Sequence, residues 1–304
     1  MKILEKYKNG NAHIVIWDDG TREIDFPDNE NLNLEFPLSI DLCITNYCER
    51  GCPWCYNNSN SKGRHGDIMN LAIIDTIPRG VEVSIGGGSA TTHPDLKKFL
   101  EKLKNKGIIA NMTVSQGEFI ENLQMINSFI EDNLIHGLGI SYKEQNDVLW
   151  KAVAENENTV VHLIAGVHTK EDFDYLAKFN LKILILGFKD LERGYYYHDA
   201  LKEQVDKNIQ WLKDNLEGYL DKFKVISFDN LGCEQLSPER LLTHEEWQTI
   251  YQGDDGTISC YIDAVNKIIQ ISSLNKEGFE LGTNIKDDFK KIRESKRGGK
   301  YEIK

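Results

Sequence analysis

The chain has few of the residues that mark several classes of protein. It holds only 6 cysteines and 6 prolines among 304 residues, which excludes a disulfide-stapled scaffold and a collagen-like or proline-rich chain. No apolar run approaches the roughly 18–20 residues of a membrane-spanning helix, and the opening residues lack the apolar stretch of a secretion signal. We therefore expect a cytoplasmic protein with no membrane partner.

Positive charge is also scarce. The 36 Lys and Arg residues are outnumbered by 48 Asp and Glu residues, which gives a net charge of −12. Such an acidic chain is disfavoured as a general binder of nucleic acid or anionic lipid. The remaining composition, 40% hydrophobic and 28% charged, is that of an ordinary globular protein with a sizeable core.

Strand-like and helix-like segments alternate along most of the chain. Two apolar-alternating segments flank the turn at residues 18–21, which predicts a β-hairpin. From Pro37 onward, helical patterns separate near-continuous apolar runs, as expected for strands buried on both faces of a parallel sheet. The expected strands are residues 38–44, 81–86, 108–114, 136–142, 159–166, 181–187 and 224–229.

Helix signals fit between these strands. A helix is expected between Pro94 and Gly107, and capping boxes begin at Thr169 and Thr243. Consecutive strand–helix units imply an α/β fold, a partial (β/α)6 TIM-like barrel, whose chemistry lies at the carboxyl ends of the strands.

The chain is expected to have three parts. Residues 1–36 form an N-terminal β-hairpin segment, residues 37–230 form the partial barrel, and residues 231–304 form a small α+β C-terminal extension. Within the extension, residues 258–273 are expected to form two strands around a short turn, followed by a helix near 286–294.

The most informative segment is the cysteine-rich loop after the first barrel strand. Cys48, Cys52 and Cys55 follow one another at spacings of four and three residues. Iron–sulfur cubanes and structural zinc sites normally take four protein ligands, so three thiolates leave one iron of a [4Fe–4S] cluster open. A zinc site with His65 or Cys43 as fourth ligand, and a redox-active Cys-x-x-Cys pair, remain as alternatives.

The spacing Cys-x3-Cys-x-aromatic-Cys, in the loop after the first strand of a βα repeat, resembles the radical S-adenosylmethionine (radical SAM) superfamily. In that family three cysteines hold a [4Fe–4S] cluster and its open iron binds S-adenosylmethionine (SAM). An external one-electron donor, of the flavodoxin or ferredoxin type, drives cleavage of SAM to a 5′-deoxyadenosyl radical that abstracts a substrate hydrogen. The resemblance implies that Cys48, Cys52 and Cys55 are the catalytic cluster ligands and that Trp54 packs against the adenine.

The segment after the second expected strand supports this resemblance. Gly87 and Gly88 resemble the glycines of the family's Gly-Gly-Glu loop, which let the backbone approach the methionyl part of SAM. Ser89 stands where the family usually has Glu, and its hydroxyl can accept a hydrogen bond from the SAM ammonium without charge assistance. Further SAM contacts implied by position at later strand ends are Ser115, Ser141, Ala165 and Leu186.

The C-terminal extension resembles a degenerate form of the SPASM extension found in peptide-modifying radical SAM enzymes. Such extensions bind auxiliary clusters through several additional cysteines, whereas this one has only Cys233 and Cys260. We expect a single cluster and a substrate that is a peptide, a protein or a small molecule. Rival functions are a zinc- or redox-type cysteine protein, and a catalytically lapsed radical SAM fold that only binds a partner, suggested by Ser89.

The single-cluster expectation is tested by iron analysis. Anaerobically reconstituted protein should contain about four irons per chain, because only one set of three cysteines is available for a [4Fe–4S] cluster. A content of about eight irons per chain would contradict it, and colourless iron-free protein would favour zinc.

Overall fold

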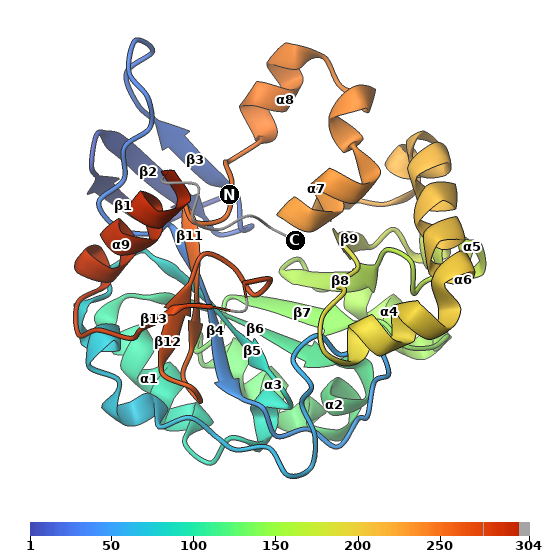
Figure 1. The fold of residues 1–304 in the computed structure, drawn as a ribbon, viewed down its shortest axis with the longest axis horizontal. Coiled ribbons are helices and arrows are strands. Elements are labelled where there is room, and N and C mark those ends of the chain that lie inside the picture. The colour runs from blue at the N-terminus through green and yellow to red at the C-terminus, as the bar shows by residue number, and fades with distance from the viewer. Residues whose placement is uncertain (276, 298–304) are drawn as a thin grey trace.

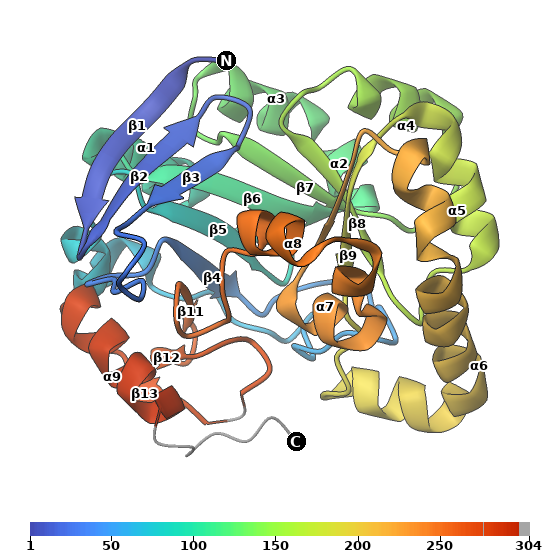
Figure 2. The ribbon, with the colours of Figure 1, turned by 90° about the horizontal axis from the view of Figure 1, so that it is seen from above.

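A ten-stranded sheet dominates the fold. The computed structural model describes residues 1–275 and 277–297, and within them it has this sheet and a separate sheet of three strands. Helices lie along the outer side of the large sheet, and the small sheet lies at one end of it (Figure 1). Seen from above, α6 (Arg193–Asn215) and α9 (Ile285–Arg297) lie on opposite sides of the molecule (Figure 2).

The order of the large sheet is β10-β9-β8-β7-β6-β5-β4-β11-β12-β13. Neighbours from β10 to β11 are parallel, and β12 and β13 add antiparallel strands at one edge. The predicted α/β class is confirmed, and seven strands lie where the sequence predicts them. These are β4 (Ser39–Thr45), β5 (Glu82–Gly87), β6 (Ile109–Ser115), β7 (Gly137–Ser141), β8 (Thr159–Ile164), β9 (Lys182–Leu186) and β10 (Val225–Phe228).

The helices follow the strands as the sequence predicts. In α1 the apolar face is buried, and Gly107 ends the helix with a left-handed φ of 71° that a glycine adopts without strain. The capping boxes at Thr169 and Thr243 begin α5 and α8. The remaining bounds are α1 (Leu96–Lys106), α2 (Gln116–Glu121), α3 (Leu123–Glu131), α4 (Asp147–Ala154), α5 (Lys170–Leu176), α7 (Asn230–Leu236) and α8 (His244–Ile250).

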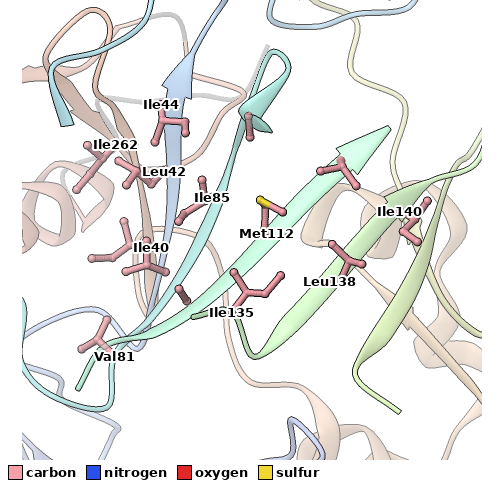
Figure 3. Close-up of a cluster of buried hydrophobic side chains, with 14 of the residues drawn as sticks. Ile40, Leu42, Ile44, Val81, Ile85, Met112, Ile135, Leu138, Ile140 and Ile262 are labelled. Atoms are coloured by element: carbon pink, nitrogen blue, oxygen red, sulfur yellow. The ribbon is translucent and has the colours of Figure 1, made fainter. Parts of the chain in front are cut away.

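One row of side chains across the large sheet forms the centre of the core. Ile262, Leu42, Ile85, Met112 and Leu138 lie opposite one another on β11, β4, β5, β6 and β7 (Figure 3). All five are buried under the outer helices. This row removes a continuous apolar surface from water, which is the main stabilising contribution to such a fold.

The neighbouring row faces the other way and has a different character. Tyr261, Asp41, Ser84, Asn111 and Gly137 lie opposite one another one register position earlier, and they line an internal cavity. In β6 buried residues alternate strictly with partly exposed ones. The expectation that the strands are buried on both faces is therefore wrong for β6, because its inner face borders a lumen and not a packed core.

The N-terminal segment has one more strand than predicted. β2 (Ala12–Trp17) and β3 (Arg22–Asp25) form the predicted hairpin, and β1 (Ile3–Asn9) pairs antiparallel with β2. Three of the seven residues of β1 are charged, and its apolar residues Ile3 and Leu4 are exposed, so β1 lacks the apolar alternation that would reveal it. An ion pair between Arg22 and Glu82 of β5 joins this sheet to the barrel.

The C-terminal part shares the large sheet. The two strands predicted within 258–273 are present as β11 (Ser259–Asp263) and β12 (Ile268–Gln270), with the short β13 (Phe279–Glu280) beside them. The helix predicted near 286–294 is α9. Because β11 pairs with β4, residues after 230 extend the barrel sheet; the last residues of the predicted extension, 298–304, lie outside the described residues.

Within the described residues, no helix combines the length and apolarity needed to cross a bilayer.

The buried face of α1 gives a test of the core. Replacing fully buried Phe99 with Ala should lower the free energy of unfolding by about 3–5 kcal/mol, because it removes apolar contacts and leaves a cavity. Exposed Lys98 on the same helix is the matched control, and its change to Ala should stay within about 0.5 kcal/mol. Equal denaturation midpoints for the two variants would contradict this account of the core.

Candidate active site

A cavity of about 910 Å³ lies inside the curved sheet. Its wall includes residues from every strand between β4 and β11, together with the cysteine-rich loop. Nine of the eleven residues predicted for the site are in this wall. They are Cys48, Cys52, Cys55, Trp54, Gly87, Gly88, Ser115, Ser141 and Leu186.

The cysteine-rich loop folds back on itself after β4. Cys48 N donates to Asn60 O at 3.0 Å, and Gly66 N donates to Ile44 O at 2.8 Å. Between these two hydrogen bonds the chain makes a tight turn, in which Cys55 N donates to Cys52 O at 3.3 Å. The three predicted ligands are therefore in one constrained loop at the carboxyl end of β4, and all three are partly exposed.

Arg193, the first residue of α6, holds this loop from across the barrel. Its Nε donates to Cys52 O at 3.1 Å and its Nη2 donates to Ser59 O at 2.9 Å. Hydrogen bonds from a charged donor typically contribute about 1.5–3 kcal/mol. The sequence carries no motif that would reveal this contact, since 141 positions separate Arg193 from Cys52.

The Cys52 thiol is affected by burial and by its neighbours. Burial raises the pKa of Cys52, the proximity of Cys55 and Cys48 raises it further, and the Arg193 guanidinium lowers it. Within the described residues, no three His, Cys, Asp or Glu side chains lie close enough to hold a metal ion. Three accessible thiols in one loop, facing one cavity, nevertheless form a donor set of the soft kind that iron–sulfur clusters use.

The two residues considered as a possible fourth zinc ligand, His65 and Cys43, make other contacts. His65 Nδ1 lies 2.9 Å from Thr45 Oγ1, and its ring packs edge-on against His93. Cys43 is buried in β4, and burial raises the pKa of its thiol to about 11. Neither residue is positioned to complete a four-ligand zinc site with the loop, so the zinc alternative is not favoured.

The glycine loop after β5 lies directly against the cysteine-rich loop. Gly87 has a φ of 116°, and a Cβ on it would lie 2.3 Å from Thr45 O; a Cβ on Gly88 would lie 2.1 Å from Tyr47 O. Only glycine permits this approach, in which Gly88 N donates to Thr45 O at 2.6 Å. Ser89 is outside the cavity wall, with its hydroxyl 3.5 Å from Cys48 Sγ.

Ser115 and Glu118 form a structural unit at the end of β6. Ser115 caps α2 by accepting from Glu118 N at 3.2 Å, and Glu118 Oε1 accepts from Thr91 N at 2.9 Å. Burial raises the pKa of Glu118, while hydrogen bonds from Thr91 lower it. The Ser-x-x-Glu spacing of a capping box was the sequence signal for Glu118, which our site prediction missed.

The other predicted contacts lie at neighbouring strand ends. Trp54 contacts Tyr197 edge-on at 5.7 Å between ring centroids, and Ser141 and Leu186 are in the cavity wall. Ala165 is not brought to the cavity, because its side chain is fully buried; its N–H donates to Leu186 O at 2.8 Å.

Charged groups inside the cavity were also missed. Asp41 faces the lumen from the middle of β4; enclosure by the barrel and the charge of Asp229 raise its pKa, and Lys189 lowers it. Lys189 Nζ donates to Ser273 Oγ at 2.8 Å and lies 4.1 Å from the centre of the Tyr56 ring. These residues come from segments far apart in the chain, so no local pattern indicated that they meet.

Comparison with known proteins gives a match in structure alone. No family model and no curated protein matches the chain. The solved structures that match include two of SuiB from Streptococcus suis, and the chain shares their fold.

One of the SuiB structures is bound to the precursor peptide SuiA; its TM-score is 0.54 at 15% sequence identity, covering 86% of this chain and 67% of that chain. The other is bound to S-adenosylmethionine, with a TM-score of 0.54 at 15% identity, covering 86% of this chain and 68% of that one. At this level of identity the likeness concerns the fold alone, an α/β architecture with a large, mostly parallel sheet.

The contact from Arg193 to the cysteine-rich loop gives a test of the predicted ligand set. Arg193→Met should fold normally yet retain less iron after reconstitution and desalting, because the loop loses two hydrogen bonds that fix Cys52 and Ser59. Exposed Lys202 on the same helix supplies the matched control, Lys202→Met. Equal iron retention in both variants would show that the two hydrogen bonds from Arg193 are not needed to hold the loop.

Proposed function

We propose that this protein is a radical SAM enzyme with a single [4Fe–4S] cluster. The observation that carries the proposal is the loop of Cys48, Cys52 and Cys55, which opens into the cavity at the carboxyl end of β4. The fold shared with SAM-bound SuiB supports the same conclusion.

Each part of the site has a task in this function. Cys48, Cys52 and Cys55 would hold the cluster as thiolates and leave one iron without a protein ligand. When bound, the cluster and SAM supply a 5′-deoxyadenosyl radical for hydrogen abstraction. Gly87 and Gly88 keep the β5 loop close to the cluster loop, so that backbone groups can contact SAM without obstruction from side chains.

The remaining wall would orient the ligand and exclude water. The Trp54 ring offers an apolar surface for the adenine, and Ser115, Ser141 and the backbone near Leu186 offer polar contacts at the strand ends. The curved wall would shield a ligand in the lumen from part of the bulk water, which protects a reactive radical from side reactions.

The substrate is proposed to be a peptide, with a small molecule as the alternative class. SuiB has been solved with a precursor peptide bound, and this chain covers 67% of that protein. The polar row at Asp41, Ser84 and Asn111 can satisfy hydrogen-bonding groups of a substrate that enters the lumen. An external one-electron donor of the flavodoxin or ferredoxin type would supply the electron, and the cytoplasm is the compartment that suits such a donor.

A single-cluster enzyme also fits the two cysteines of the predicted C-terminal extension. Cys260 is buried in β11. Cys233 is half-buried in α7, where burial raises the pKa of its thiol to about 11. Neither residue is in the wall of the cavity that the three cysteines of the loop line.

The deciding experiment is an assay for 5′-deoxyadenosine. Protein reconstituted anaerobically with iron and sulfide should release it from SAM under a strong reductant, and Cys52→Ala should release none because a cluster ligand is lost. Cys233→Ala is the matched control, since it removes a thiol outside the loop, and its yield should equal that of the original protein.

The negative outcomes are distinct. A complete cluster without 5′-deoxyadenosine would indicate a lapsed radical SAM fold that binds a partner. Failure to assemble any cluster would refute the proposed function.

A further inference from the structure

Two hydrogen-bond donors lie at the sulfur of Cys48. The Ser89 hydroxyl and the Arg50 backbone N–H are each 3.5 Å from Cys48 Sγ. Cys48 therefore receives hydrogen bonds from two separate segments, Ser89 of the loop after β5 and Arg50 of its own loop.

The Ser89 hydroxyl is held in place by its backbone. Ser89 N donates to Tyr47 O at 2.8 Å, and Ser89 O accepts from Thr92 N at 3.1 Å and from Thr92 Oγ1 at 2.6 Å. The residue is only 5% exposed. Because Ser89 is already in place beside Cys48, it need not move when the negative charge on the sulfur increases. Its hydrogen bond therefore stabilises the more negatively charged state of the sulfur more strongly.

The direction of the hydrogen bond follows from the chemistry of the two groups. A thiolate bound to iron has no proton and can only accept, so the Ser89 hydroxyl must donate to Cys48 once a cluster is present. A carboxylate at this position could not donate, and it would add a negative charge next to the cluster.

We propose that Ser89 is a positioning residue that sets the reduction potential of the cluster through its hydrogen bond to Cys48. The inference rests on the proposed function, because it requires a cluster on the three cysteines. One-electron reduction by the external donor places additional negative charge on the cluster and its sulfur ligands. A hydrogen bond to a ligand sulfur stabilises that reduced state more than the oxidised state, and so raises the potential.

The test is a potentiometric titration of the reconstituted cluster, followed by electron paramagnetic resonance without SAM. Ser89→Ala should shift the midpoint to a more negative potential. We expect up to a tenfold lower ratio of reduced to oxidised cluster at a fixed potential, which corresponds to about 59 mV for one electron. Ser89→Thr keeps a hydroxyl on the same backbone and should retain a midpoint near that of the original protein.

Ser227→Ala is the matched control. Ser227 lies on β10, and its hydroxyl donates to Ile183 O at 3.0 Å and not to a cysteine. This variant should leave the midpoint unchanged, and iron content should be equal in all four proteins.

Resonance Raman spectra provide a second readout that does not depend on the potential. Iron–thiolate stretching bands should shift between H2O and D2O in the original protein, and a part of that shift should be lost in Ser89→Ala. A full cluster in Ser89→Ala with an unchanged midpoint and an unchanged isotope shift would overturn the inference while leaving the proposed function standing. Absence of a cluster from the original protein would overturn both.

Discussion

The site depends on the close contact between the ends of β4 and β5. Gly88 lies so near the Tyr47 carbonyl that a Cβ would be only 2.1 Å from it. This contact, with the hydrogen bonds from Gly88 N to Thr45 O and from Ser89 N to Tyr47 O, fixes the glycine loop against the cysteine-rich loop. A side chain at Gly88 would push the two loops apart and separate the Ser89 hydroxyl from Cys48. The close contact of the two backbones therefore positions both the cysteines and the residues around them.

The two faces of the parallel strands then divide the remaining tasks. The row that contains Leu42, Ile85 and Met112 packs under the outer helices and stabilises the barrel. The row one position earlier contains Asp41 and Ser84 and borders the lumen. Since side chains alternate along a strand, a shift in register by one residue would exchange these rows and destroy core and cavity together. The alternation of side chains along each strand therefore determines both the stability of the core and the lining of the cavity.

Much of the fold and part of the site could be predicted from local patterns. Apolar runs located the strands of the barrel, and capping boxes located helix starts such as those after Thr169 and Thr243. Strand β1 was missed because its charged, exposed residues carry no apolar alternation. The burial of β6 on both faces was wrong because an apolar run looks the same whether its second face meets packed side chains or a lumen.

The sequence by itself determined the chemical groups and their local spacing: three cysteines in one loop, two glycines and a serine in the next, and the strands that precede them. The tertiary structure alone decided which distant groups meet. It brings Ser89 to Cys48 across 41 positions and Arg193 to Cys52 across 141. The local pattern of apolar residues indicates only whether a residue is buried and in which element it lies. Contacts between distant elements form when the complete sheet assembles, because burial of apolar surface then offsets the chain entropy lost in closing long loops.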